Sequence, residues 1–544
     1  MRGITRIIPC SAAASRAAVA INLLKKRSVS SLESSSTRPA TRKHDTRKWD
    51  MLRKQEHIYA TMFTSGEVTV ENHGTPQVAD ALVEALRLQW AYGHPYTPKG
   101  FPLLTHAFHA YPAGMQPAAA RHLLETVLPG TSVLDPFVGG GTVVLEAMRA
   151  GRVAVGSDIS PLALFVSRGR CWTSSDDELD RLREASRSIS SAASAKLCGG
   201  ASRLASGADW EVVKAAIGDY LADEETWPGL EVERALWFVF AVARSRGAKA
   251  RRRRPTNGRP PFVADRYFQS VSTEYASAIA GLTRAATAAA APYSPQQALL
   301  VYRDARQPVP PSSSPGTQQP PTDPEEPAPP GVKDTAAGKI RDSSVTGVEG
   351  IPAGMVFDAV LTSPPYPGVY DYLGHARSAR SQLGALPRPH MTPSRPAGST
   401  SGRRESVFID SAVPSGRDWP SNWTDGEIGA RSEVRRRARR NAAFSGGGDI
   451  SGLGRKWADD QKEWLAATSR VLRSGGGRIA VMVGDGDGVD TRSSLLEGVE
   501  GLGRREGEGG SGLGLRVVGW ATLRAARDAR RSMRTEHLVL LEKS

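Results

Sequence analysis

Cysteine is scarce in this sequence: Cys10, Cys171 and Cys198 are the three cysteines among 544 residues. They form neither a spaced metal-binding motif nor a disulfide framework. This excludes a cysteine-ligated metal centre and a disulfide-stapled secreted fold, and it favours a reducing compartment. Long apolar runs are also missing, since the longest, residues 235–243, is too short to span a bilayer. We therefore expect neither a bound metal nor a membrane among the partners of the chain.

Acidic residues are outnumbered by basic ones. The chain has 71 Lys and Arg residues against 56 Asp and Glu residues, a formal net charge of +15. A surplus of this size indicates an acidic partner, and nucleic acid is the first candidate. Arginine clusters within residues 249–254 and 435–440 fit such a partner, because they would contact phosphates without reading a base sequence. The alternative for each cluster is solvated low-complexity charge.

The first 48 residues differ in composition from the rest of the chain. They are basic, rich in Ser and Ala, and poor in acids. This composition is typical of an organelle transit peptide, for a mitochondrion or a plastid, and we favour that interpretation over a disordered basic tail. The basic run at residues 249–255 makes the nucleus the alternative destination.

Alternating strand and helix patterns begin near residue 117. Residues 117–128 have helical apolar spacing, and residues 132–137 have the pattern of a short buried strand. A glycine turn then opens a helix over 139–151, and residues 153–159 form a second strand pattern. Strand, helix and strand within about thirty residues predict a βαβ unit and hence a parallel sheet.

The glycine turn, residues 139–141, follows the strand that contains Asp135. Glycine lets the backbone approach a ligand closely, and a helix N-terminus offers N–H groups, although a tight strand-to-helix connection is the alternative. Asp158 ends the next strand, 23 residues after Asp135, where an acid can accept hydrogen bonds from ribose hydroxyls. The alternative for Asp158 is a helix N-cap before Pro161. Together these features favour a nucleoside-bearing cofactor, which need not be a dinucleotide because the turn lacks the GxGxxG spacing.

Asp304 lies near the end of a third strand pattern, residues 299–306, and therefore reaches the same edge of the sheet. Its carboxylate could accept a hydrogen bond from an adenine amino group there. The alternative is a surface acid paired with Arg303 or Arg306.

A fourth strand pattern, residues 356–361, leads into Ser363, Pro364, Pro365 and Tyr366. The two prolines fix φ and remove two N–H donors but keep their carbonyls as acceptors. An exocyclic amino group could donate to the Ser363 hydroxyl and the Pro364 carbonyl, which would direct the nitrogen lone pair at an electrophilic methyl group. Tyr366 would stack on a base that is flipped out of a duplex. The alternative is a rigid Pro-Pro turn with a core tyrosine.

The order of these segments resembles that of the amino-methylating DNA methyltransferases that use S-adenosylmethionine. "VLDPFVGGGTVVLEAMRAGRVAVGSDISPLA" (133–163) is similar to their cofactor-binding motif and "LTSPPY" (361–366) to their catalytic motif. "HAFHAYPAGMQPAAAR" (106–121) is similar to the segment that completes the methionine side of the pocket. "DYLGH" (371–375) and "EIGAR" (427–431) resemble the SPPY subgroup. Serine at the first catalytic position is similar to the cytosine-N4 enzymes, whereas adenine-N6 enzymes more often have Asp or Asn there.

The resemblance implies a set of site residues. The implied catalytic residues are Ser363, Pro364, Pro365 and Tyr366. The implied S-adenosylmethionine-binding residues are Tyr111, Asp135, Pro136, Phe137, Gly139, Gly141, Thr142, Asp158, Ile159 and Asp304. No metal is implied, because the sulfonium of this cofactor is already a strong electrophile.

The resemblance also implies the fold and the division of the chain. The expected fold is an α/β, Rossmann-like class I methyltransferase sheet, mostly parallel with its last strand, near 536–541, antiparallel. The expected division is 1–48 transit peptide, 49–170 N-terminal segment and cofactor half, 171–298 helical insertion, 299–306 third core strand, 307–350 disordered Pro-rich loop, 351–375 catalytic segment, 376–455 basic variable region in place of a target-reading region, and 456–544 C-terminal half.

The implied function is methylation of a base amino group, with cytosine N4 in DNA as the expected target. Methylation of an RNA base or of adenine N6 in DNA is the alternative within the same class. A catalytically idle nucleic-acid-binding protein on the same fold is the alternative from another class, although the presence of Ser363, Pro364 and Tyr366 argues against it.

Overall fold

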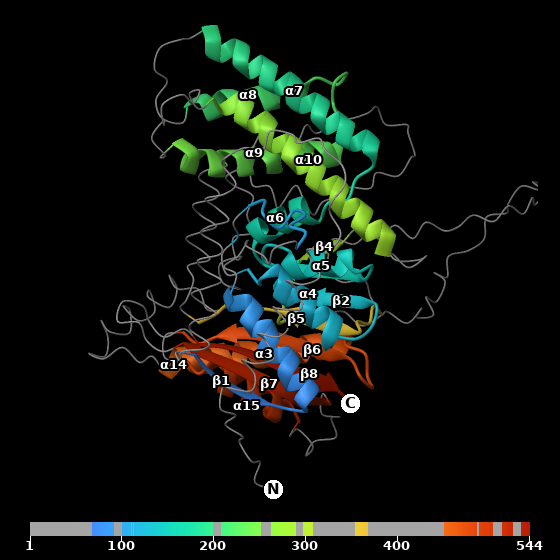
Figure 1. Cartoon of the computed structure of the whole chain (residues 1–544), viewed down its shortest axis with the longest axis vertical. Helices are drawn as coiled ribbons and strands as arrows, with labels where there is room; N and C mark the ends of the chain where they lie inside the picture. Colours follow the sequence, from blue (N-terminus) through green and yellow to red (C-terminus); the bar gives the residue numbers. More distant parts are fainter. Residues whose placement is uncertain are drawn as a thin grey trace, which may run out of the picture.

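The structure is a computed structural model (Figure 1). It describes residues 68–91, 101–109, 111, 114–199, 208–251, 263–289, 298–307, 354–367, 451–486, 489–503, 514–525 and 535–544.

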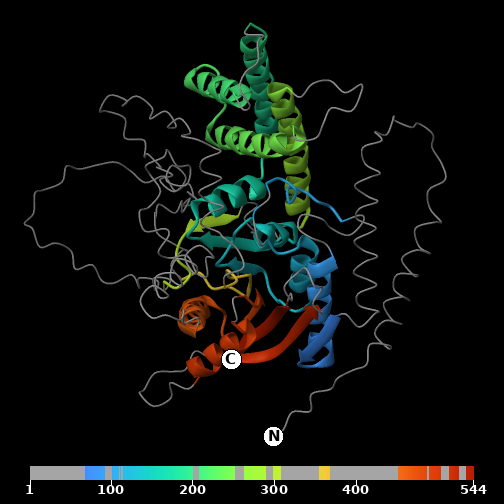
Figure 2. The ribbon, with the colours of Figure 1, turned by 90° about the vertical axis from the view of Figure 1, so that its left-hand side faces the viewer.

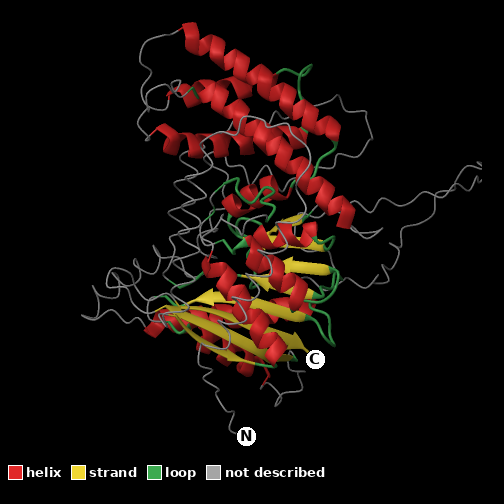
Figure 3. Ribbon diagram, viewed as in Figure 1, coloured by secondary structure: helices red, strands yellow, loops and turns green. Residues whose placement is uncertain are grey.

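One mixed sheet with strand order β1-β7-β8-β6-β5-β2-β3-β4 organises the described residues. Five neighbouring strands are parallel, and Figure 3 shows them in yellow below the helices at the top of the view. They are β2 (Ser132–Asp135), β3 (Val153–Asp158), β4 (Leu299–Tyr302), β5 (Ala359–Thr362) and β6 (Arg478–Gly484). The predicted parallel α/β sheet is confirmed, and its strand order gives it a Rossmann-like arrangement.

The other end of the sheet is antiparallel. The last strand, β8 (Thr535–Lys543), pairs antiparallel with β6 on one side and with β7 (Leu515–Ala525) on the other, as expected for the end of the chain. An edge strand that the sequence patterns did not predict, β1 (Val68–His73), pairs antiparallel with β7. Residues ahead of the expected βαβ unit thus extend the same sheet.

Each strand buries alternate residues on opposite faces of the sheet, so there are two hydrophobic layers. In β5, Ala359 and Leu361 join a cluster with α3 (Pro76–Ala91), α4 (Pro117–Thr126) and α5 (Thr142–Arg149). Val360 instead joins a cluster with α14 (Ser451–Val471) and α15 (Thr491–Gly503). Figure 2 shows the blue helix α3 and the orange helix α14 on opposite sides of the red strands.

Five helices are described between β3 and β4 in the sequence. They are α6 (Pro161–Cys171), α7 (Asp176–Gly199), α8 (Ala208–Ala222), α9 (Leu230–Arg251) and α10 (Ala264–Ala289). The last four form a lobe beyond the β4 end of the sheet (Figures 1 and 3). The lobe has its own core, in which the fully buried rings of Phe238, Phe268 and Tyr275 pack together with α7 and α8 residues.

Several predicted features lie outside the described residues and stay predictions. They are the transit peptide, nearly all of the Pro-rich loop, the segments 371–375 and 427–431, nearly all of the basic variable region with its 435–440 cluster, and most of the basic run 249–255. Among the described helices, none has the length and apolar character that crossing a membrane requires.

Candidate active site

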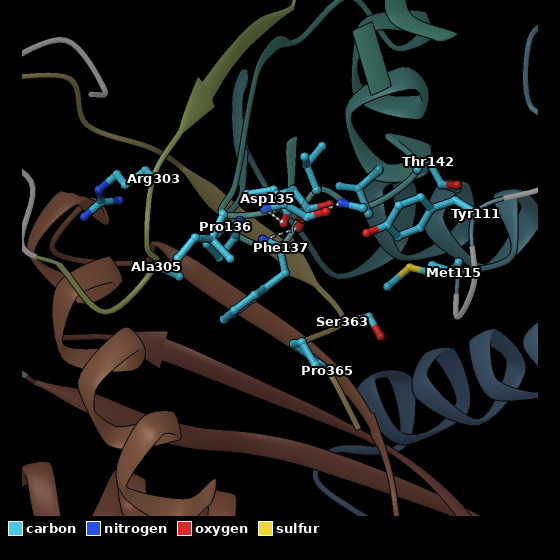
Figure 4. A pocket seen from close by; sticks show the side chains of 18 of the residues that line it. Tyr111, Met115, Asp135, Pro136, Phe137, Thr142, Arg303, Ala305, Ser363 and Pro365 are labelled. Carbon is cyan, nitrogen blue, oxygen red and sulfur yellow. Dashed lines mark hydrogen bonds between the residues drawn. The ribbon is translucent and has the colours of Figure 1, made fainter. Parts of the chain in front are cut away.

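A cavity of about 830 Å³, including its part open to solvent, lies at the carboxyl ends of β2, β3, β4 and β5 (Figure 4). In parallel α/β sheets, ligands bind at this edge. Every predicted site residue lines the cavity except Gly141, Pro364 and Tyr366. Eight further lining residues were not predicted from the sequence: Gly114, Met115, Val138, Gly140, Val143, Ser160, Arg303 and Ala305. All eight lie within four positions of a predicted site residue in the sequence, so their position next to those residues could have identified them.

The glycine turn needs its glycines for conformation and for space. Gly139 and Gly141 have φ values of 48° and 78°, in the left-handed region that side chains disfavour. A Cβ atom on Gly140 would lie 2.6 Å from the Arg170 guanidinium, and one on Gly141 would lie 2.9 Å from the Ser167 side chain. The turn delivers the N-terminus of α5 to the cavity, where Thr142 is the first helical residue. Gly141 thus shapes the turn without lining the cavity.

Asp158, at the end of β3, is held by backbone N–H groups. Gly139 donates to its Oδ2 atom at 3.0 Å and Ser160 donates to its Oδ1 atom at 2.8 Å. Burial raises the pKa of Asp158 to about 6, and these two N–H groups oppose the shift. The carboxylate is thereby fixed at the cavity wall, and each oxygen keeps acceptor capacity for a ligand hydroxyl.

Asp135, at the end of β2, is more deeply buried, with 3% of the residue exposed. The Thr362 hydroxyl donates to its Oδ1 atom at 2.7 Å, and the Phe137 N–H donates to the same oxygen at 3.2 Å. Burial raises the pKa of Asp135 to about 7, against the hydrogen bond from Thr362. Two carboxyl groups with raised pKa values in one cavity are typical of a functional site.

Asp304 lines the cavity and is also ion-paired. Arg306 donates to its two carboxylate oxygens from Nε at 3.0 Å and from a terminal nitrogen at 2.6 Å, and it reaches Asp460 on α14 at 2.8 Å. Asp304 is therefore paired with Arg306, as in the alternative interpretation, and it also lines the cavity. A ligand amino group at this position would share the carboxylate with Arg306.

The Ser-Pro-Pro-Tyr segment continues directly from β5. Ser363 and Pro365 line the cavity, and in Figure 4 they lie across it from Tyr111 and Met115. The indole nitrogen of Trp457, on α14, donates to the Pro365 carbonyl at 3.1 Å. The segment is thus anchored to α14 while Ser363 faces the cavity.

Tyr366 is buried, with 7% of the residue exposed, in the layer between the sheet and α14. Its ring lies against β6, where a Cβ atom on Gly484 would be 2.7 Å from the ring. In this structure Tyr366 is therefore a core residue, as in the alternative of a rigid Pro-Pro turn with a core tyrosine. Stacking on a base, as the sequence analysis expects, requires the ring or its neighbours to move.

A hydrogen-bonded chain that the sequence analysis missed lies where β6 ends. Arg492 donates to the Thr522 hydroxyl at 2.9 Å, that hydroxyl contacts His537 Nδ1 at 2.9 Å, and His537 Nε2 contacts Asp485 at 2.9 Å. Asp485, Asp490 and His537 place possible ligand atoms within 4.8 Å of one another. Asp485 and His537 already have hydrogen-bond partners within the protein, so the closeness of these three side chains is explained without an ion.

Comparison with known proteins gives one local similarity. A segment of 82 residues is 37% identical to the type II methyltransferase M.MvaI of Kocuria varians, and it covers 14% of this chain and 18% of that protein. The match thus spans less than a fifth of the length of the relative. No family model and no solved structure matches the chain. The similarity supports a relationship to methyltransferases at that coarse level.

Proposed function

We propose that this protein transfers a methyl group from S-adenosylmethionine to an exocyclic amino group of a nucleic-acid base, with cytosine N4 in DNA as the target. The observation that carries the proposal is one shared cavity. Asp135 and Asp158, predicted for the cofactor, and Ser363, predicted for the amino group, all line it. Three residues predicted separately from three strand ends therefore meet at one place.

The residues at the cavity fit the proposed cofactor in chemistry. Asp158 offers carboxylate oxygens to ribose hydroxyls, and the side chains of Ile159 and Ala305 offer an apolar wall for an adenine ring. In Figure 4 Tyr111 lies on the side of the cavity opposite Ala305, with Asp135 between them, and a cationic amino acid portion gains from that carboxylate. When bound, S-adenosylmethionine supplies an electrophilic methyl group, so the chain itself needs to provide position and a dry surrounding.

The acceptors on the β5 end suit an amino group. The Ser363 side chain faces the cavity, whereas the Pro365 carbonyl is used by Trp457. The Pro364 carbonyl is the other proline acceptor for a base, and because Pro364 does not line the cavity in this structure, the turn must shift to present it. Two acceptors hold both N–H bonds of an amino group and reduce conjugation of its lone pair with the ring. Such bonds accelerate the reaction when they strengthen as charge develops on the nitrogen.

Serine at position 363 supports cytosine N4 over adenine N6, by resemblance to the cytosine-N4 enzymes. The net charge of +15 supports a nucleic-acid substrate of either kind. The expected target is therefore a cytosine in DNA, and RNA bases and adenine are the outcomes that a direct assay must separate.

The test is incubation of the purified chain with isotopically labelled S-adenosylmethionine and either duplex DNA or RNA, followed by digestion to nucleosides. We expect label in N4-methylcytosine from DNA. Label in an RNA nucleoside or in N6-methyladenine would replace the proposed target with that one. Cofactor binding without label in any nucleic acid would leave the idle binding protein as the function. Ser363→Ala serves as the matched control for a contaminating enzyme.

A further inference from the structure

A short segment, residues 101–109, brings the chain to Tyr111 at the cavity, and its backbone is strained. Leu104 and His109 have φ values of 45° and 64°. For residues other than glycine such values are unfavourable and persist where surrounding contacts enforce them. These two are the described residues other than glycine with positive φ, so the strain is concentrated in this segment.

Arg170, on α6, supplies the contacts that hold this segment. One terminal nitrogen donates to the Gly140 carbonyl at 2.6 Å, and the other donates to the carbonyls of His106 at 2.6 Å and His109 at 2.8 Å. The backbone carbonyl of Arg170 accepts a hydrogen bond from Thr105 at 2.5 Å. One side chain thus joins the glycine turn to the strained residue His109.

The environment of Arg170 is unusual for a cation. Its side chain is fully buried, and within the described part of the chain no carboxylate forms an ion pair with it. Burial lowers the pKa of the guanidinium to about 10, which still leaves it charged at neutral pH. A buried cation without an anion is costly, and the three carbonyl acceptors are what compensates it. The geometry is therefore specific to a planar donor with several N–H groups.

The clamp lies directly beside the cavity. A Cβ atom added to Gly140 would be 2.6 Å from the Arg170 guanidinium and 3.0 Å from the Cβ atom of Tyr111. Gly139 is similarly close to Tyr111, since a Cβ atom added to Gly139 would be 3.2 Å from the Tyr111 ring. Arg170, the glycine turn and Tyr111 form one packed unit, and both the turn and the tyrosine line the cavity.

The helical lobe holds the same segment from the other side. Arg246, on α9, donates to the Ala107 carbonyl at 2.9 Å and lies 4.8 Å above the centre of the Phe108 ring. Phe108 also packs edge-on against Tyr275 of α10, with ring centres 5.3 Å apart. The segment is therefore fixed between α6 and the lobe, and His106 also binds Glu146 of α5 at 2.8 Å. A loss at Arg170 removes the link between the segment and the glycine turn but leaves these other contacts in place.

We propose that Arg170 is a positioning residue that sets Tyr111 over the glycine turn and thereby sets the affinity for S-adenosylmethionine. This inference rests on the proposed function. Arg170 contacts neither the amino group acceptors nor the cavity directly, so it acts on cofactor binding through the turn and the tyrosine. The rate at saturating cofactor depends on Ser363 and Pro364, which Arg170 does not contact.

The test compares Arg170→Lys and Arg170→Met with Arg168→Met in the full chain. Arg168 is on the same helix but pairs with Glu231 of the lobe, away from the cavity. We expect Arg170→Met to weaken S-adenosylmethionine binding by about 10-fold to 100-fold in calorimetry, about the loss expected for one charge-assisted hydrogen bond. Arg170→Lys should fall between wild type and Arg170→Met, because one ammonium cannot reach both sets of carbonyls. Arg168→Met should bind as wild type.

A second variant separates positioning from general loss of structure. In the Arg170→Met background, His109→Gly removes the backbone strain, because glycine adopts a φ of 64° freely. We expect the double variant to regain about fivefold in cofactor affinity. In steady-state methylation, the KM for the cofactor should follow these affinities, while kcat should stay within about twofold of wild type.

The outcomes are distinct. If wild type does not bind S-adenosylmethionine, the proposed function fails. If wild type binds it and Arg170→Met binds equally well, the positioning role is overturned. Should Arg170→Met not fold, Arg170→Lys decides, since equal binding by wild type and the folded lysine variant overturns the inference. A lowered kcat with unchanged KM for the cofactor also overturns it.

Discussion

Thr362, the last residue of β5, donates a 2.7 Å hydrogen bond through its hydroxyl to Asp135, the last residue of β2. The two strands are parallel neighbours in the sheet. Thr362 immediately precedes Ser363, and Asp135 immediately precedes residues 136–138, which line the cavity and lead into the glycine turn. This single bond therefore connects the segment proposed for the base with the segment proposed for the cofactor.

Thr362→Val should weaken both stability and cofactor binding. Valine has nearly the same shape but donates nothing, so Asp135 keeps one hydrogen bond, from Phe137. Leaving a buried acceptor short of a partner costs about 1–3 kcal/mol of unfolding free energy. Denaturant unfolding and calorimetry with S-adenosylmethionine measure the two effects. Thr362→Ser, which retains the hydroxyl, is the control, and equal behaviour of the valine and serine variants would contradict the role of this bond.

The contributions of Asp135 and Asp158 to the stability of the ligand-free protein should fall as the pH rises from about 4 to about 7. Burial raises the pKa values of Asp135 and Asp158 from 3.8 to about 7 and about 6. The folded protein therefore keeps protons that the unfolded chain has released, and each group contributes a loss of about 1.4 kcal/mol per pH unit while it titrates. Two neighbouring groups contribute with the opposite sign. Bonds from His106 and Arg121 outweigh burial and lower the pKa of Glu146 from 4.5 to about 2, and burial lowers the pKa of His106 below 6.5, so both contributions to stability rise with pH up to the unfolded values.

Denaturant unfolding at several pH values within this range checks the prediction. Asparagine at position 135 does not titrate, so the stability of Asp135→Asn relative to wild type should increase as the pH rises through this range. The pKa of Asp135 should also fall when a cationic cofactor binds beside it, so binding near pH 6 should release protons to the buffer. A pH dependence identical in wild type and Asp135→Asn would remove Asp135 as its cause.

The sheet was largely predictable from the sequence because its strands are short and apolar and are separated by clear turn residues. The patterns at 117–128, 132–137 and 153–159 correspond to α4, β2 and β3. β1 was missed because its sequence, VTVENH, has polar residues on an edge strand, and its pairing with β7 joins residues more than 440 positions apart. Local periodicity carries no information about such a distant partner.

The candidate site was predictable to a similar degree and for a similar reason. Residues at strand ends meet at one edge whenever the sheet is parallel, so Asp135, Asp158 and Ser363 could be brought together from the pattern alone. The burial of Tyr366 and the pairing of Asp304 with Arg306 depend on α14, which lies far along the chain. Those contacts are decided by packing between distant segments, which spacing in the sequence does not encode.

Asp158→Asn should reduce the affinity for S-adenosylmethionine. The asparagine side chain has one acceptor oxygen, whereas the carboxylate uses both oxygens for the N–H groups of Gly139 and Ser160. The variant therefore loses negative charge and acceptor capacity towards ribose, about 1.5–3 kcal/mol per charge-assisted bond. Calorimetry measures the change, and Asp180→Asn, at an exposed acid on α7 that pairs with Arg183, is the control. Unchanged affinity in Asp158→Asn would remove this residue from the cofactor site.

Gly484→Ala should displace Tyr366. The added methyl group would lie 2.7 Å from the ring and 3.2 Å from the Thr535 carbonyl, so the ring must shift. We expect methylation to slow much more than cofactor affinity falls, because Tyr366 does not line the cofactor cavity. Gly501→Ala is the matched control: nothing lies within 4 Å of its added Cβ, and alanine in a helix changes stability by about 1 kcal/mol or less. Equal methylation by both variants would show that the ring position is irrelevant to turnover.

Substitutions at Ser363 and at Tyr366 should have different effects on methylation. Ser363→Ala removes the hydroxyl acceptor at the cavity but leaves the Pro364 carbonyl, so methylation in a single turnover should slow while cofactor affinity stays the same. Tyr366→Phe should retain most activity, because packing and stacking both use the ring. Tyr366→Ala would open a cavity in the layer under α14 and cost about 3–5 kcal/mol of stability, so a loss of activity there would not separate stacking from folding.

The decisive comparison is therefore Ser363→Ala with Tyr366→Phe, each measured by single-turnover methylation and by calorimetry with S-adenosylmethionine. Slow methylation by Ser363→Ala with normal cofactor affinity, beside near-normal rates for Tyr366→Phe, is the pattern that an amino-group clamp produces. Wild-type rates from Ser363→Ala would mean that the serine hydroxyl does not hold the amino group. The Pro-Pro segment would then be a rigid turn, anchored by Trp457 through the Pro365 carbonyl, that shapes the cavity without contributing an acceptor from residue 363.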